Sequence, residues 1–392
     1  MAGYIRKRGK GSWEITVRLG RDPVTGRLRR RFLTVRGTKR DAERALTEAL
    51  HQRDTGTDIV PARITLAEYL ETWLRDYAAH NVAPSTLARY TGIIRRHLIP
   101  ALGDLRLRDI RPAHIQAAYG RYSMQGGRAD GRPGALAPRT ILQHHRVLRE
   151  ALHHAIQWQL ISVNPADSVK PPHPQRQEMQ VLSLDECVKL LELAETGPYH
   201  ALIYMALSTG ARIGELLALR WRDIDFDAEV MRITRTSYRL SGHGIVFSAP
   251  KTPRAVRPVA LSPDTLAILR QHRRTQVETR LAVGPMYEDH DLVFAWATGN
   301  PLDRGAVRRA FARLLARAGL PHVRLHDLRH SAGTLMLAAG VNPKVVSERL
   351  GHATVAITLD VYSHVLPELQ REAAVAMDRL LGKHSARPAS EG

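Results

Sequence analysis

The chain of 392 residues lacks the features that mark several large classes of protein. No segment approaches the roughly 18 consecutive apolar residues that a membrane-spanning helix requires. The basic first ten residues are followed by a charged, strand-like segment instead of the apolar core of a signal peptide. Cys187 is the only cysteine, which excludes an intramolecular disulfide and a cysteine-rich zinc site. We therefore expect a cytoplasmic protein without a membrane partner, in which Cys187 is a small buried side chain.

Acidic residues are scarce relative to basic ones. The 58 Lys and Arg exceed the 38 Asp and Glu, which gives a formal charge of +20, although 44% of the chain is hydrophobic and can build two or three domains. Nucleic acid is the expected partner, because cations that neutralise a polyanion release its counterions. Arginine supplies 50 of the 58 basic residues, so codon composition is an alternative source of the excess. The distribution of charge along the chain has to decide.

The basic charge is concentrated at the N-terminus. The first forty residues hold 13 Lys or Arg and only two acids, a net charge of +11. Residues 13–19 and 31–35 have the composition of strands, residues 22–26 that of a turn, and a helix is expected over about 39–52. We predict that residues 1–58 form a small basic sheet with one helix that binds DNA. A merely solvated basic face is the alternative.

Residues 62–164 predict an all-helical domain. Thr65 and Glu68 form a capping box before a helix whose apolar face should lie in the core: Leu66, Tyr69, Leu70, Trp73, Leu74 and Tyr77. Further helices are expected over about 85–98, 112–122 and 138–160, with a glycine-rich loop over 126–134. Arginines on the polar faces suit a surface that grips a DNA backbone, or any solvated helix: Arg89, Arg95, Arg96, Arg139, Arg146 and Arg149.

The proline-rich residues 165–180 predict an extended linker. A third domain over 181–385 begins with a second capping box, formed by Ser183 and Glu186. Short strands near 230–234 and 256–261 and helices to about residue 381 complete it. The predicted fold class is a multidomain chain, mainly α with small β-sheets, in which the third domain is mixed α/β and mostly helical.

Five positions in the third domain combine residue types suited to phosphate chemistry. They are Arg212, in the segment Thr209-Gly210-Ala211-Arg212-Ile213-Gly214-Glu215, Lys251 in Pro250-Lys251-Thr252, the quartet His326-Asp327-Leu328-Arg329, His352 in Leu350-Gly351-His352, and Tyr362. Their order resembles the tyrosine recombinase or phage integrase family: an arginine, a hairpin lysine, His-x-x-Arg, a second histidine and, about ten residues later, a tyrosine. The resemblance is tightest in the third domain. For the first two domains, compared with the family's arm-type and core-type (SAM-like) DNA-binding domains, it rests on order and size.

The residue types also make chemical sense without the family. Two guanidiniums, those of Arg212 and Arg329, can clamp the non-bridging oxygens of a phosphodiester under attack. A tyrosine of pKa about 10 is ionised in only about one part in a thousand at neutral pH, a deficit near 4 kcal/mol. Tyr362 as nucleophile therefore needs a general base, for which we expect His326, while His352 donates a hydrogen bond to the phosphate. Taken singly, each histidine would more often be structural.

The resemblance implies two further roles. Lys251 is similar to the family's general acid, which protonates the departing 5′ oxygen, and Glu215 resembles a supporting acid that positions Arg212. His326 and His330 have the spacing of a zinc motif, but Asp327 replaces its glutamate and no third ligand follows at the expected spacing. No phosphate-binding glycine loop is present. We therefore expect neither metal nor nucleotide cofactor, since a phosphotyrosyl bond stores the energy of the cleaved backbone.

The sequence thus predicts a site-specific recombinase that integrates or excises a phage or other mobile element, acting on the nucleoid. By resemblance, its partners are double-stranded attachment sites, three further copies in a synaptic tetramer, and accessory proteins such as an excisionase or a host DNA-bending protein. A C-terminal helix over about 367–381 would pack in cis or on a neighbour through Leu369, Ala373, Ala376 and Leu380. The alternatives are a conjugative-element recombinase, a decayed integrase that only binds DNA, and a zinc hydrolase. Attachment sites and host are not encoded in these motifs.

Overall fold

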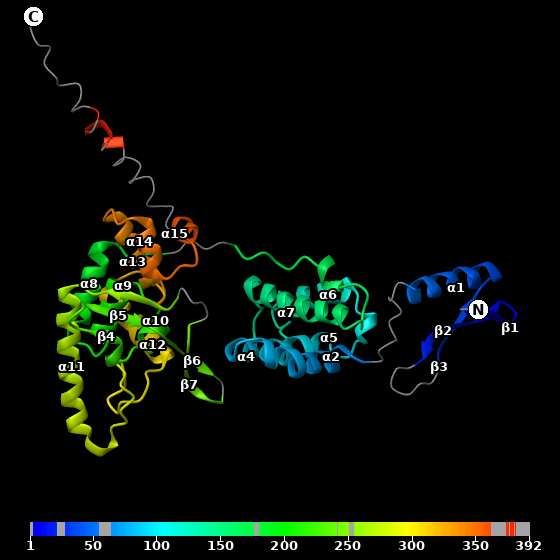
Figure 1. Cartoon of the computed structure of the whole chain (residues 1–392), viewed down its shortest axis with the longest axis horizontal. Helices are drawn as coiled ribbons and strands as arrows, with labels where there is room; N and C mark the ends of the chain where they lie inside the picture. The colour runs from blue at the N-terminus through cyan, green and yellow to red at the C-terminus, as the bar shows by residue number, and fades with distance from the viewer. Residues whose placement is uncertain are drawn as a thin grey trace, which may run out of the picture. The chain divides into compact units, whose positions relative to one another are not determined.

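The computed structural model describes residues 3–21, 28–54, 64–175, 180–240, 242–250 and 255–361, and the short stretches 374–375, 377–379 and 381. The chain divides into two compact units, Met1–Arg176 and Gln177–Gly392 (Figure 1). Within the described residues, no helix combines the length and the apolar character needed to cross a bilayer. Small sheets and many helices confirm the predicted fold class, mainly α with small β-sheets.

The first unit begins with an antiparallel sheet of order β1-β2-β3, formed by Gly3–Gly9, Ser12–Arg21 and Leu28–Arg36. Helix α1, Lys39–Asp54, covers one face, because alternate residues of the central strand point toward it. Ile15 and Val17 are fully buried there, together with Ala42 of α1. The sheet and helix are those predicted, with β1 added. The turn expected over 22–26 lies outside the described residues.

Helices alone build the second part of this unit. The predicted capping box is present, with Thr65 N donating to Glu68 Oε2 at 2.8 Å and Glu68 N to Thr65 Oγ1 at 3.2 Å. The predicted apolar face is buried from Leu66 to Leu74, and Tyr77 is half-buried. The helices are α2 Leu66–Trp73, α3 Ala79–Asn81, α4 Pro84–Ile93, α5 Ile99–Leu102, α6 Pro112–Tyr122 and α7 Pro138–Gln157.

Two single π-helical turns interrupt these helices, Leu74–Ala78 after α2 and Ile94–Leu98 after α4. Such turns are rare and add a residue to the helix locally. Buried side chains lie at both ends of each turn, so the core continues across the interruption: Leu74, Ala78, Ile94 and Leu98.

The linker is shorter than its proline content predicted. Pro165–Ser168 forms a 3-10 turn, and Ala166 and Val169 are buried in the core of the helical domain. Asn164 caps this turn by accepting a hydrogen bond from Ala166 N at 3.0 Å. The prolines therefore end a packed domain before any extended chain begins, and residues 165–169 belong to that domain.

The second unit places two small sheets among its helices. Its helices are α8 Leu184–Ala194, α9 His200–Thr209, α10 Ile213–Leu216, α11 Pro263–Val283, α12 Arg304–Ala318, α13 Asp327–Ala338, α14 Pro343–Leu350 and α15 Val355–Val361. A sheet of order β4-β5-β8 comprises Ile224–Asp225, Val230–Ile233 and Arg257–Ala260, and a hairpin comprises β6 Thr236–Leu240 and β7 Gly244–Ser248. The strands predicted near 230–234 and 256–261 are present, as is the capping box of Ser183 and Glu186.

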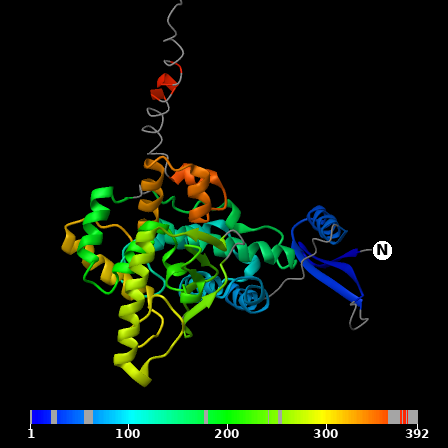
Figure 2. The same cartoon turned by 60° about the vertical axis from the view of Figure 1, so that its left-hand side comes forward.

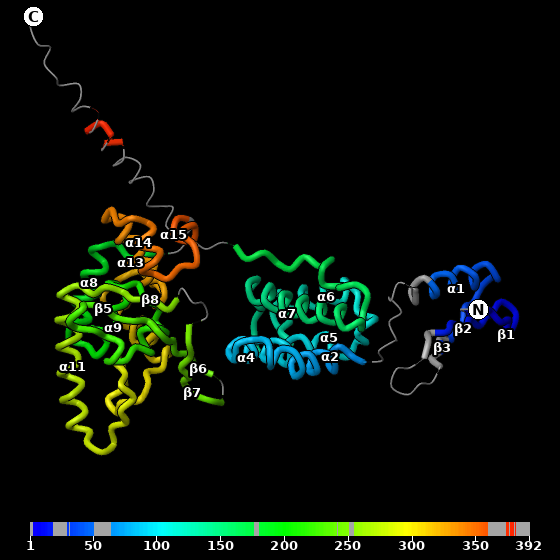
Figure 3. The backbone as a smooth tube through the Cα atoms, viewed as in Figure 1, coloured from blue at the N-terminus to red at the C-terminus, as the bar shows by residue number. Residues whose placement is uncertain are grey.

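A large apolar cluster and a small one formed by Leu337, Val346 and Leu350 hold this unit together. Met205 of α9, Met231 of β5 and Val259 of β8 are buried in the large cluster. Helix α11 runs along one side of the unit (Figure 2), while the β6–β7 hairpin extends from its body (Figure 3). Cys187 is buried in α8, as expected, and burial raises the pKa of its thiol to about 11. The core thus fixes α9 and α10, which flank Arg212, and α13, which carries Arg329.

Candidate active site

The turn between α9 and α10 presents Arg212. Helix α9 is followed by its C-cap residue Gly210, whose φ of 64° lies in the left-handed region, and a Cβ at this position would collide with Leu350 Cδ2. Only glycine fits both demands. Arg212 follows as the N-cap residue of α10, and its side chain is 40% exposed. The guanidinium therefore reaches solvent from a backbone that is fixed on both sides.

Two contacts hold the side chain of Arg212. Its Nη1 donates to Glu215 Oε1 at 2.8 Å, and its Nη2 donates to the Gly351 carbonyl at 3.3 Å. Glu215 also accepts a hydrogen bond from Arg212 N at 2.9 Å. Burial alone would raise the pKa of Glu215, but the charge of Arg257 and hydrogen bonds from Arg257 and Arg212 lower it below its ordinary value. Glu215 is thus a buried carboxylate that accepts hydrogen bonds from both the backbone and the side chain of Arg212.

Helix α13 supplies the His-x-x-Arg pair. Arg329 is only 3% exposed, and its Nη1 donates to the Gly210 carbonyl at 2.7 Å. His326 precedes the first residue of α13 and is half-buried, with its ring 5.4 Å from that of His330. Burial first, and then electrostatic interactions with His330 and Arg329, lower the pKa of His326 to about 4. In the free protein at neutral pH, His326 is therefore uncharged and able to accept a proton.

His352 lies directly after α14. Gly351 again takes a left-handed φ, 69°, and turns the chain so that His352 Nδ1 is 2.8 Å from Thr358 Oγ1. Burial and the charges of Arg329 and Arg212 lower the pKa of His352 to about 4. The Thr358 hydroxyl thus holds the His352 ring through Nδ1.

The structure brings together the five described members of the predicted set. Arg212 contacts Gly351 beside His352, Arg329 contacts Gly210 beside Arg212, and the charge of Arg329 acts on both His326 and His352. Two other members, Lys251 and Tyr362, lie outside the described residues. Lys251 falls between β7 and β8, and Tyr362 directly follows the last residue of α15. The residues predicted to pack in the C-terminal helix, Leu369, Ala373, Ala376 and Leu380, also lie outside.

Sequence reasoning missed Arg257. This residue begins β8, and its side chain is 6% exposed although it is an arginine. A signal was available, because a strand over 256–261 puts Arg257 on the same face as the apolar Val259 and Leu261. An arginine on the buried face of a strand requires a partner, and here that partner is Glu215, at 3.1 Å.

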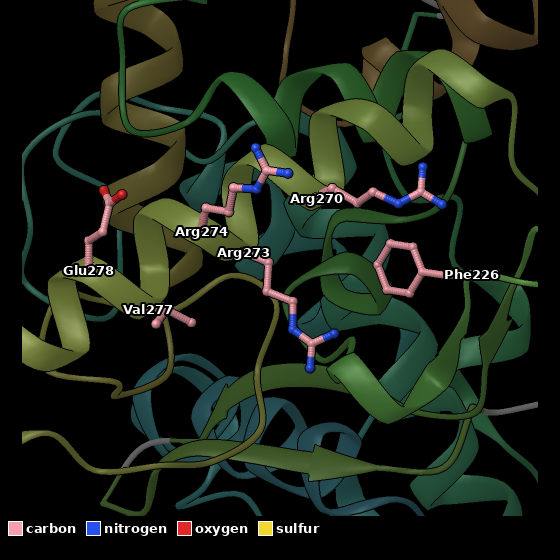
Figure 4. Close-up of a pocket in the computed structure, with 6 residues that line it drawn as sticks. All are labelled: Phe226, Arg270, Arg273, Arg274, Val277 and Glu278. Carbon is pink, nitrogen blue, oxygen red and sulfur yellow. The ribbon is translucent and has the colours of Figure 1, made fainter.

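A second feature of this unit is an open pocket of about 650 Å³ on α11. Figure 4 shows its lining of Phe226, Arg270, Arg273, Arg274, Val277 and Glu278. The guanidinium carbon of Arg270 is 5.4 Å from the centre of the Phe226 ring, and that of Arg273 is 5.2 Å from the centre of the Trp221 ring. Among the described residues of the predicted site, none lines this pocket. Over the described part of the chain, no cluster of three His, Cys, Asp or Glu side chains is arranged to hold a metal ion.

Comparisons with known proteins identify two matching family models and several relatives. The model of the phage integrase family matches residues 180–368, and that of the phage integrase N-terminal SAM-like domain matches residues 65–121. A "Tyrosine recombinase XerC-like" protein of Caldanaerobacter subterraneus subsp. tengcongensis is 28% identical, over 95% of this chain and 97% of the relative.

Solved structures show the same fold. The Tn1549 transposon integrase in complex with transposon right end DNA has a TM-score of 0.65 at 22% identity, covering 79% of this chain and all of that one. The lambda integrase tetramer bound to a Holliday junction has a TM-score of 0.54 at 22% identity, covering 92% of this chain and 94% of that one. With two family models matched in the predicted order and a relative aligned along almost its whole length, this chain belongs to the phage integrase family and is a site-specific tyrosine recombinase.

Proposed function

We propose that this recombinase cleaves and rejoins DNA through Tyr362, with Arg212, Lys251, His326, Arg329 and His352 as catalytic residues and Glu215 in support. The observation that carries the proposal is the convergence of two fixed guanidiniums and two uncharged histidines in one half-buried site. Charge develops on the non-bridging oxygens as the phosphodiester is attacked. Cations that are already fixed stabilise this charge without reorganising during the reaction.

The first step forms a bond between Tyr362 Oη and the scissile phosphorus. The phenolic proton passes to His326, which is uncharged in the free protein at neutral pH. The bond from phosphorus to the 5′ oxygen breaks, and this oxygen takes a proton from Lys251. The product is a 3′-phosphotyrosyl link and a free 5′ hydroxyl. Attack by a 5′ hydroxyl from another strand reverses each transfer, returning a proton to Lys251 and the phenolic proton to Tyr362.

The three-domain division serves this chemistry. We propose that residues 1–58 bind arm-type sites. The helical domain over 62–164, with residues 165–169 packed on it, and the catalytic domain over 181–385 would grip the core site, and the chain around residues 170–180 would link them. Basic side chains exposed on the first sheet support the assignment: Arg6, Lys7, Arg8, Arg18, Arg30 and Arg36. Phosphate contacts would position the protein on DNA, and base contacts would select the site.

The expected partners are double-stranded attachment sites, met in the cytoplasm at the nucleoid, and three further copies in a synaptic tetramer. The lambda integrase tetramer on a Holliday junction supports the tetramer, because its fold is shared. An N-terminal arm module favours integration and excision of a phage or conjugative element over resolution of chromosome dimers. An excisionase and a host DNA-bending protein are proposed as accessory factors on the resemblance alone.

The test is a covalent trapping assay. Wild type, Tyr362→Phe and the matched control Tyr287→Phe are incubated in EDTA with a nicked duplex, selected from random DNA by binding to the Tyr362→Phe chain. Tyr287 is half-buried and lies beside Asp289 and Arg280, away from the predicted site. We expect a denaturation-resistant protein–DNA adduct from wild type and Tyr287→Phe but none from Tyr362→Phe. If none of the three gives an adduct on DNA that all bind, the chain is a DNA-binding protein without cleavage activity.

A further inference from the structure

Arg257 takes no part in the reaction proposed above, yet its guanidinium donates to two backbone carbonyls as well as to Glu215. Its Nη2 donates to Glu215 Oε2 at 3.1 Å, and its Nε donates to the Arg349 carbonyl at 2.7 Å. Its Nη1 donates to the Ala255 carbonyl at 3.0 Å and lies 3.4 Å from Glu215 Oε1. One buried guanidinium thus joins β8 to α10 and to the end of α14.

The contact with Glu215 leads directly to Arg212. Oε1 of Glu215 accepts from the Arg212 side chain at 2.8 Å, and Oε2 accepts from Arg212 N at 2.9 Å. Both oxygens are therefore shared between Arg212 and Arg257, and the Glu215 side chain is only 2% exposed. A carboxylate buried this deeply needs a buried opposite charge to stay ionised. Arg257 supplies it, because the other partner, Arg212, has a side chain that is 40% exposed.

The contact with α14 leads to Arg212 and His352 by a second route. A Cβ on Gly351 would lie only 2.8 Å from Arg257 Nη1, so the guanidinium is packed against this turn. The Gly351 carbonyl accepts a hydrogen bond from Arg212 Nη2 at 3.3 Å, and His352 follows in the chain. Arg257 therefore contacts both groups that hold the Arg212 side chain, the Glu215 carboxylate and the turn at Gly351.

We propose that Arg257 is a positioning residue, which acts through Glu215 and the Gly351 turn to hold Arg212 against the scissile phosphate. The inference rests on the proposed function, because it assigns Arg257 to the clamp on the non-bridging oxygens. Two other roles make different predictions. Arg257 could be a purely structural ion pair, or it could act on Lys251, which lies six residues earlier in the chain.

The first measurement is the rate of adduct formation on ordinary phosphate DNA. The variants are Arg257→Gln and Arg257→Lys, with Arg220→Gln as the matched control, because Arg220 makes a part-buried ion pair with Asp223 at 2.9 Å elsewhere in the unit. We expect a loss of about 100-fold for Arg257→Gln, the size expected when a fixed donor to a developing oxyanion is misplaced. Arg257→Lys should recover part of the rate, and Arg220→Gln should stay within about threefold of wild type.

The deciding measurement changes the substrate. A methylphosphonate at the scissile position replaces a charged non-bridging oxygen by a neutral methyl group, so the clamp has less charge to offset. The ratio of wild-type to Arg257→Gln rates should then shrink from about 100 to below about five, in parallel with the ratio for Arg212→Gln. A defect of equal size on both substrates would mean that Arg257 is merely structural and would overturn the proposal.

A second substrate tests the route through Lys251. A bridging 5′ phosphorothiolate gives a thiolate leaving group, which departs without a general acid because a thiol has a pKa of only about 8.5. The proposal expects the Arg257→Gln defect to persist on this DNA. If the defect disappears here and remains on the methylphosphonate, Arg257 acts on Lys251 and the proposal is wrong.

Two further controls keep the outcomes separate. If Arg257→Gln does not fold, Glu215→Gln/Arg257→Gln removes both buried charges together, which avoids an unpaired one. This double variant should fold, cleave phosphate DNA slowly and regain activity on the methylphosphonate; failure to regain it would overturn the proposal. If wild type forms the adduct and the Arg257 variants form it at the wild-type rate, this inference is overturned and the proposed function stands. Absence of any wild-type adduct removes the proposed function and this inference with it.

Discussion

The fold treats basic residues of two regions in opposite ways. One region is the second unit, Gln177–Gly392, here called the catalytic unit because it holds the candidate active site, and the other is the N-terminal sheet. In the catalytic unit, Arg212, Arg257 and Arg329 each donate to a carbonyl, and two of them share the buried Glu215. On the sheet, the face away from α1 exposes its cations, and Arg18 of β2 is the register partner of Arg30 of β3. Like charges placed opposite each other across two strands destabilise a sheet.

The difference separates two tasks. A group that stabilises charge developing on one phosphate has to be in position before the reaction begins. Backbone carbonyls and a buried carboxylate therefore hold it in place. A surface that tracks many phosphates gains from side chains that remain hydrated until DNA arrives, since much of its affinity comes from released counterions. Within one chain, arginines held by the fold therefore suit catalysis, and arginines exposed on a surface suit DNA binding.

The largest expected effect breaks the fixed side of this comparison. Arg329→Lys keeps the positive charge but loses the forked guanidinium that donates to the Gly210 carbonyl and that the proposed mechanism directs at a phosphate oxygen. We expect the rate of adduct formation to fall by about 10³-fold, at the upper end for loss of one oxyanion donor. Affinity for the same DNA, measured by fluorescence anisotropy in a Tyr362→Phe background, should change less than about threefold. A fall in rate below about tenfold would remove Arg329 from the catalytic set.

The second prediction sharpens the comparison through pH. His144, His326 and His352 all have a pKa lowered to about 4, with burial as the first cause. The N-terminal sheet contains no histidine, because the first histidine of the chain is His51. Between about pH 6.5 and 4 the unfolded chain binds more protons than the folded one, so stability is present above pH 6.5 and is lost as the pH falls.

We expect each of these histidines to remove of the order of 1 kcal/mol of unfolding free energy between pH 6.5 and 5. Hydrogen exchange followed by mass spectrometry, corrected for intrinsic rates, should show this loss in the helical domain and the catalytic unit but not in residues 3–21. His144→Gln, at a site that is 1% exposed, should reduce the loss in the helical domain alone. Equal acid sensitivity in all three regions would contradict the assignment.

The smallest expected effect lies on the adjustable side. Arg6→Gln/Arg30→Gln removes two exposed cations from the sheet, and Lys39→Gln, from an exposed pair with Glu43 on α1, is the matched control. The slope of log affinity against log salt on a long duplex should become shallower by about 1.8, which is 0.9 for each lost phosphate contact. Cleavage of DNA that is already bound should not change. An unaltered slope would show that this face of the sheet is simply solvated.

The site was far more predictable than its support. Arg212, His326, Arg329 and His352 could be proposed because their order resembles the family pattern, and phosphate chemistry accounts for their residue types. The burial of Arg257 could have been inferred from the strand pattern, but its partners could not, since they lie 42 and 92 residues away and only the folded chain brings them together. The contacts of Arg257 depend on β8, α10 and the end of α14 coming together, and the local sequence pattern does not indicate which elements pack together.

Two errors in the fold have similar local causes. Strand β1 was missed because Arg6 and Lys7 hide the alternation of Gly3 and Ile5, which face α1. The linker was begun too early because prolines usually mark extended chain, whereas Pro165 starts a turn whose next residue, Ala166, is fully buried. In both places tertiary packing overrode a composition that indicated solvent-exposed chain.

The two π-helical turns of the helical domain bear on how this chain can be compared with others. A π-turn accommodates one residue more than the α-helix around it, so Leu74–Ala78 and Ile94–Leu98 mark places where the chain is one residue longer than an uninterrupted helix. Because buried residues flank each turn, a shorter homologue could lose that residue and keep the same core. Single-residue gaps in alignments of this domain are therefore expected at these two turns, where deletion scanning should find the greatest tolerance.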